Sequence, residues 1–159
     1  MDIELGAAIG GAATILAAVA AAVGSITSGW LSRLHQKRAI RAALLAEVAA
    51  LSSIIRRRKY REDLEEAAEH VRRTGDQYEL TVPVPPHYCR IYAANVTSVG
   101  LLEPALAQKL VVFYQLVDSV VQDVSSGGVL ASGSDDPADF TDAKDLLDEA
   151  LAVADSLAS

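Results

Sequence analysis

The chain of 159 residues contains a single cysteine, Cys89, and aromatic residues make up only 5% of it. One cysteine can form no intrachain disulfide and builds no cysteine metal site, which fits a reducing compartment. No nucleophile beside a base, no set of metal ligands and no glycine-rich phosphate loop occurs at a catalytic spacing. These absences predict a protein that is not an enzyme, with no cofactor, no metal and no small-molecule substrate.

Charged residues are also missing from positions 5 to 32, between Glu4 and Arg33. About 20 apolar residues in a helix cross a bilayer, so residues 1–32 are predicted to be a transmembrane anchor. Two alternatives stay open, an alanine-rich helix buried inside a large assembly and a cleaved signal peptide. The acidic start of the chain, with Asp2 and Glu4, disfavours the signal peptide, because such peptides begin with positive charge.

Small residues recur every three or four positions along this stretch. Such a stripe allows two helix backbones to approach closely in lipid, where packing drives association. We therefore expect a helix-contact face, used by a protein partner or by a second copy in a homo-oligomer, made of Gly6, Gly10, Ala13, Ala17, Ala20 and Gly24.

Basic residues follow the apolar stretch directly. An excess of Lys and Arg beside a span marks the cytoplasmic side, and such residues also contact anionic lipid headgroups. The sequence thus predicts a bacterial inner-membrane protein with its N-terminus outside and its C-terminal domain in the cytoplasm. The predicted headgroup contacts to membrane lipid are Trp30, Arg33, Lys37, Arg38 and Arg41.

Charge of opposite sign is concentrated at the two ends of the remaining chain. Residues 33–73 carry eleven basic and six acidic side chains, whereas residues 101–159 carry two basic and eleven acidic ones. An acidic half of this kind argues against nucleic acid as a partner.

Helical periodicity predicts an all-α cytoplasmic domain over residues 33–125. Apolar residues recur at intervals of three and four in two segments, and the two seams could pack antiparallel in a helical hairpin or bundle. One helix is expected from Arg33 to about Arg73, continuing from the membrane. The predicted packing seam comprises Leu44, Val48, Leu51, Ile55, Leu106, Leu110, Phe113 and Val117.

A basic cluster interrupts the first seam around residues 56–61. Arg58 and Glu62 are four residues apart, as are Arg61 and Glu65, so the cluster can pair along its own helix. The alternative is a site for lipid or for an acidic partner. Beyond it, Gly75 is expected to cap the helix, three prolines to impose an extended connector over 83–86, and Gly100 to end a short helix.

The C-terminal part is predicted to be tethered. Residues 126–136 have the composition of a flexible linker, and Asp136 before Pro137 is expected to begin an acidic amphipathic helix over 137–159. Whether this helix docks on its own bundle or on a neighbour is open at this point.

One segment carries a resemblance: Tyr92, Asn95, Gly100, Leu101, Leu102, Pro104, Phe113 and Tyr114. It is similar to a segment of uncharacterised small bacterial single-pass membrane-anchored helical proteins, which have no assigned activity. The resemblance covers about a quarter of the chain and implies an anchored helical protein of bacterial or phage origin.

Two functions are compatible with these features. The first is a membrane-anchored helical protein that binds a protein partner or self-assembles, as an accessory subunit or scaffold of a membrane complex. The second is a membrane-perturbing effector of phage or defence origin that oligomerises in the bilayer.

Overall fold

The computed structural model describes residues 33–158, and it divides into two compact units, Met1–Ala39 and Ile40–Ser159. In the first unit the described residues, 33–39, are helical. The predicted transmembrane stretch and its contact face lie outside the described residues. Within residues 33–158, no helix combines the length and the apolar character that a membrane crossing requires.

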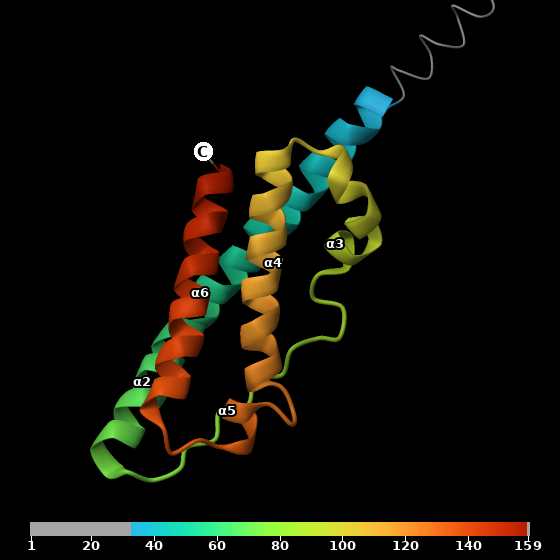
Figure 1. Ribbon diagram of the computed structural model, residues 1–159. Coiled ribbons are helices and arrows are strands. Elements are labelled where there is room, and N and C mark those ends of the chain that lie inside the picture. Colours follow the sequence, from blue (N-terminus) through green and yellow to red (C-terminus); the bar gives the residue numbers. More distant parts are fainter. Residues whose placement is uncertain (1–32, 159) are drawn as a thin grey trace, which may run out of the picture. The chain divides into compact units, whose positions relative to one another are not determined.

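The second unit begins with a helix over residues 40–58, which ends at an elbow. Lys59 has φ 59° and ψ 32°, a left-handed conformation that stops one helix before α2, Tyr60–Thr74, begins (Figure 1). The prediction of one helix through Arg73 was therefore wrong. A non-glycine residue in the left-handed region costs on the order of 1 kcal/mol. No glycine or proline at this position indicates in the sequence that the helix ends here.

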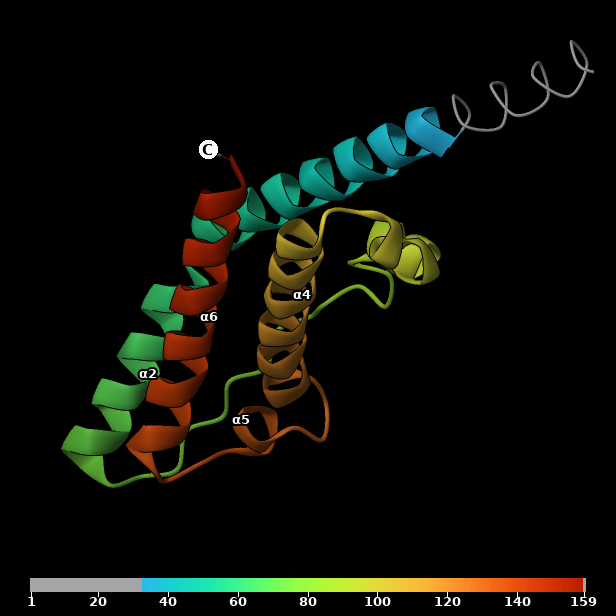
Figure 2. The ribbon, with the colours of Figure 1, turned by 45° about the horizontal axis from the view of Figure 1, so that its top comes forward.

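Helix α6, Pro137–Ala158, packs against both α2 and α4, Pro104–Val124, and lies between them (Figure 2). Its apolar face is buried and rich in small residues, with Ala143 and Ala150 at 1% and 0% exposure, which allows close approach. The helical bundle is thus confirmed, but its pairing differs from the predicted hairpin. Helix 40–58 crosses α4 obliquely in Figures 1 and 2, whereas α6 runs alongside α4.

The segment before α6 is packed, which corrects the prediction of a flexible linker. Residues Val129–Ser132 form the short helix α5, and the Leu130 side chain is 1% exposed. Asp136 caps α6 as predicted, because its side chain accepts a hydrogen bond from the Ala138 N–H at 2.8 Å. The open question of docking is settled in favour of the same chain, since α6 supplies a large part of the core.

Residues 75–103 connect α2 to α4. Gly75 caps α2 with φ 71° and donates its N–H to the Val71 carbonyl at 2.8 Å, as predicted. After the extended connector, residues 76–85, come α3, Arg90–Asn95, and a 3-10 helix η1, Val96–Leu101. Gly100 lies inside η1, so its predicted role as a helix stop was wrong. Helix α4 begins at Pro104.

Candidate functional site

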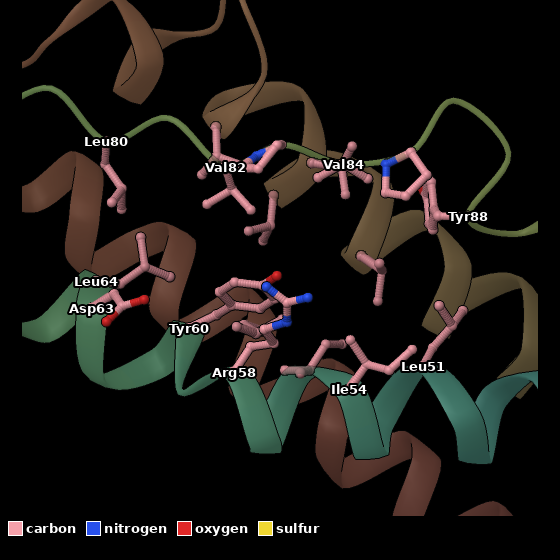
Figure 3. A pocket seen from close by; sticks show the side chains of 18 of the residues that line it. Leu51, Ile54, Arg58, Tyr60, Asp63, Leu64, Leu80, Val82, Val84 and Tyr88 are labelled. Carbon is pink, nitrogen blue, oxygen red and sulfur yellow. The ribbon is translucent and has the colours of Figure 1, made fainter.

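An apolar cavity of about 410 Å³ lies between the elbow and the extended connector (Figure 3). Its size is within the roughly 300 to 1,000 Å³ typical of ligand sites. Helix 40–58 and α2 form one wall, the connector forms the opposite wall, and α4 and α6 complete the lining. The aliphatic lining residues are Leu51, Ile54, Ile55, Leu64, Leu80, Val82, Val84, Val117, Val120, Val121, Val124 and Leu147.

Backbone hydrogen bonds hold the connector in place. The Leu80 N–H donates to the Leu130 carbonyl at 2.8 Å, and the Val82 N–H donates to the Val124 carbonyl at 3.0 Å. Side chains alternate along an extended segment, so Leu80, Val82 and Val84 all line the cavity from this wall. At its far end the Tyr88 hydroxyl donates to the Asp118 carboxylate at 2.9 Å.

Six titratable side chains join the apolar lining: Arg58, Tyr60, Asp63, His87, Tyr88 and Arg90. The two guanidinium groups outnumber the one carboxylate. In Figure 3 Arg58 reaches from the end of helix 40–58 toward the cavity, whereas Asp63 lies beside Leu64 at one side. Within the described part of the chain, Arg58 and Arg90 form no ion pair.

The basic cluster of residues 56–61 pairs differently from the prediction. Arg61 binds Asp148 through both its Nε and a terminal nitrogen, and Arg56 contacts Asp155 at 2.8 Å, so both partners lie on α6. The predicted pair of Arg58 with Glu62 is not formed, because the elbow at Lys59 lies between these two residues. Arg61 and Glu65 share α2, but Arg61 pairs with Asp148 on α6 instead. Two residues of the basic cluster therefore have their acidic partners on the C-terminal helix of the same chain.

A buried carboxylate, Glu47, organises the contact between helix 40–58 and α3. It is 7% exposed and accepts hydrogen bonds from the Ile91 N–H, the Tyr92 N–H and the Tyr114 hydroxyl, each at 2.8 Å. The Tyr92 and Tyr114 rings stack with centroids 3.9 Å apart. Glu47 thereby caps the N-terminal end of α3 from another helix.

Sequence reasoning missed Glu47 altogether. One indication was present, since Glu47 directly precedes Val48 and follows Leu44 by three residues, which places a charge at the border of the apolar seam. Two of its partners, Tyr92 and Tyr114, belong to the segment that carries the resemblance. The presence of both tyrosines is explained by the packing of α3, since both contact Glu47 and their rings stack on each other.

Burial decides the protonation of the groups around this network. Burial and the hydrogen bond to Glu47 raise the pKa of Tyr114 far above its ordinary value, and burial with the Asp118 bond does the same to the pKa of Tyr88. Burial also raises the pKa of the Cys89 thiol, and the Glu47 carboxylate raises it further. Cys89 is therefore held as a thiol, the less nucleophilic form.

The other predicted residues divide into two groups. Of the predicted headgroup contacts, Trp30 lies outside the described residues, and Arg33, Lys37, Arg38 and Arg41 are exposed. Of the eight residues of the predicted packing seam, six are buried, and Leu51 and Leu106 are half-buried against the core. The cavity itself was not predicted, because its walls come from segments up to about a hundred residues apart.

Comparisons with known proteins give no relative. No protein-family model, no curated protein and no solved structure matches this chain. Function therefore has to be argued from the residues and from the geometry of the cavity.

Proposed function

We propose that this chain is a non-enzymatic binding protein of a membrane, whose charge-free N-terminal stretch anchors it and meets a helix of a protein partner or of a second copy. The helical unit that follows acts in the cytoplasm as the binding part of an accessory subunit or scaffold. The observation that carries the binding role is the cavity, whose lining is mostly aliphatic.

The lining favours binding over catalysis. A catalytic site needs a nucleophile or a metal held next to an acid or a base. In the described part of the chain, no group of three or more acidic, histidine or cysteine side chains could hold a metal ion. Cys89, the most nucleophilic residue type available, is held as a thiol by its surroundings.

The anchor is supported by sequence alone. Residues 5–32 contain no ionisable side chain, and the basic residues Arg33, Lys37, Arg38 and Arg41 follow at once. This order is typical of a span whose basic flank faces the cytoplasm. The small residues of the predicted contact face would permit close helix packing, which a span of modest hydrophobicity needs.

Fractionation of the expressed protein tests the anchor. The full chain should sediment with membranes and resist carbonate extraction, whereas a variant lacking residues 1–32 should stay in the supernatant. A reporter fused after Ser159 should have cytoplasmic activity. A full chain that remains in the supernatant without detergent would contradict the anchor.

Association through the small stripe is tested separately. Gly10→Leu with Gly24→Leu adds bulk and hydrophobicity together, so insertion should persist while the crosslinked complex is lost. Leu16→Ala with Val23→Ala is the matched control, which should weaken insertion more than association. Growth arrest on expression of the full chain, abolished by the glycine replacements, would instead favour the membrane-perturbing effector.

A further inference from the structure

We propose that the cavity between the elbow and the connector binds a single-chain organic acid, with the aliphatic chain inside the cavity and the carboxylate paired with Arg58. This ligand goes beyond the proposed function, which assigns the anchor and the protein partner but no small molecule. It rests on the same cavity as the binding role of the proposed function but not on the anchor, and all residues of the cavity lie in the second unit.

The cavity walls match an aliphatic chain. Leu, Ile and Val side chains from four helices and the connector form the lining, so each CH₂ group of a chain inside the cavity would be removed from water, which is favourable. Ile54 is 50% exposed although it is a large apolar residue on this lining. A bound aliphatic chain would cover Ile54 and shield this exposed apolar side chain from water.

The cationic side of the cavity matches a carboxylate. Arg58 reaches toward the cavity without an ion pair in the described part of the chain, and Arg90 also lines it. Arg57 and Lys59 flank Arg58 in the same basic run, and they too form no ion pair with described residues. Because α6 neutralises only Arg56 and Arg61, the elbow keeps a positive charge beside an apolar cavity.

The cavity volume favours one chain over a two-chain lipid. At about 410 Å³ it lies near the small end of the range for ligand sites. The connector is fixed on α4 and α5 by its backbone hydrogen bonds, so this wall of the cavity is held in place. A free long-chain acid therefore fits the observations better than the two acyl chains of an anionic phospholipid.

Photolabelling of the full chain in phosphatidylcholine nanodiscs tests the site. The probe is a palmitate that carries a diazirine in its chain, and the control probe is the matching alcohol, which lacks the carboxylate. Labelled peptides are mapped by mass spectrometry, so labelling within residues 1–32 is counted separately. The acid should label residues 51–64, 80–90 and 117–124, and the alcohol should label them less.

Two pairs of variants test the carboxylate contact. Ile54→Lys and Ile54→Glu remove the same apolar contact at a half-exposed position but differ in charge, so the lysine variant should label more than the glutamate variant. Arg58→Gln should reduce labelling by about fivefold, which corresponds to roughly 1 kcal/mol for a partly exposed ion pair. Arg57→Gln is the matched control, since Arg57 belongs to the same basic run but does not line the cavity.

Several outcomes would overturn the proposal. Equal labelling by acid and alcohol, or equal labelling of the two Ile54 variants, would exclude carboxylate recognition. An equal loss of labelling in Arg57→Gln and Arg58→Gln would show that the basic run attracts the acid in general and that Arg58 makes no specific contact with the carboxylate. Competition by unlabelled phosphatidylglycerol but not by free palmitate would assign the cavity to an acyl chain of a membrane lipid. Labelling spread evenly over residues 33–158 would exclude a defined site. A circular dichroism melt of each variant shows that it is folded.

Failure of this proposal and failure of the anchor are distinguishable. If the full chain proves to be soluble, the same labelling map is recorded without nanodiscs, and the expected peptides do not change. If the anchor holds but the cavity is not labelled, only the ligand is wrong.

Discussion

Replacement of Glu47 by glutamine should destabilise the helical unit by about 3 kcal/mol. The carboxylate accepts from the Ile91 N–H with one oxygen and from the Tyr92 N–H and the Tyr114 hydroxyl with the other, all at 2.8 Å. A glutamine has one acceptor oxygen, so its amide N–H₂ group would face the Ile91 N–H. Glu47 is 7% exposed, which leaves little access for water to replace the lost acceptor.

The magnitude follows from the lost and the weakened bonds. One buried donor left without a partner costs about 1 to 3 kcal/mol, and the two remaining bonds lose the strength that a charged acceptor provides, roughly 1 kcal/mol together. For a unit of this size, a loss of 3 kcal/mol lowers Tm by roughly 10 °C. Thermal and urea denaturation of the full chain, followed by circular dichroism, measures both quantities.

Glu66→Gln is the matched control, because Glu66 is exposed on α2 and the same change there should stay within about 0.5 kcal/mol. Tyr114→Phe should cost about 1 kcal/mol, and less than that in the Glu47→Gln background, because the two side chains share a hydrogen bond. A Glu47→Gln variant as stable as Glu66→Gln would refute the assignment of Glu47 as the cap of α3.

Three further predictions concern other parts of the unit. The Arg61 and Lys144 side chains lower the pKa of Asp148, so their contribution is present above the unfolded pKa of about 3.9 and is lost as pH falls below it. Asp148→Asn should therefore cost about 0.5 to 1 kcal/mol at pH 7 and less at pH 2, as measured by urea denaturation at both values. Gly75→Ala should cost about 1 kcal/mol in the same assay; its φ is 71° and a Cβ there meets no atom within 4 Å, so a neutral result would contradict the left-handed cap. The Cys89 thiol should react with iodoacetamide at pH 8 more slowly than the same thiol in urea, and equal rates would contradict its raised pKa.

Local features of this fold could be read from the sequence, because each depends on neighbours along the chain. The apolar seam of α4, the proline at its start and the glycine cap of α2 follow from helical periodicity and from the backbone preferences of these residues. The same holds for Asp136 before Pro137, where the side chain caps the helix that it precedes.

Features that join distant segments were decided by the tertiary structure. A serine- and glycine-rich segment has the same composition whether it is free or packed, so only the burial of Leu130 and the contacts of α5 with α4 and α6 show that this segment packs against the core. The basic cluster offered partners four residues away, but ion pairs depend on distance in space, and α6 brought Asp148 and Asp155 closer.

The candidate site shows the same division. The sequence by itself determined which residues are aliphatic and which are basic, and thus that an apolar face and a cationic run occur near residues 51–61. Only the fold decided that they border a cavity, because the left-handed Lys59 that bends the helix has no local cause in residue type. The connector that forms the other wall is held by hydrogen bonds to residues more than 40 positions away, and periodicity along the chain carries no information about such contacts.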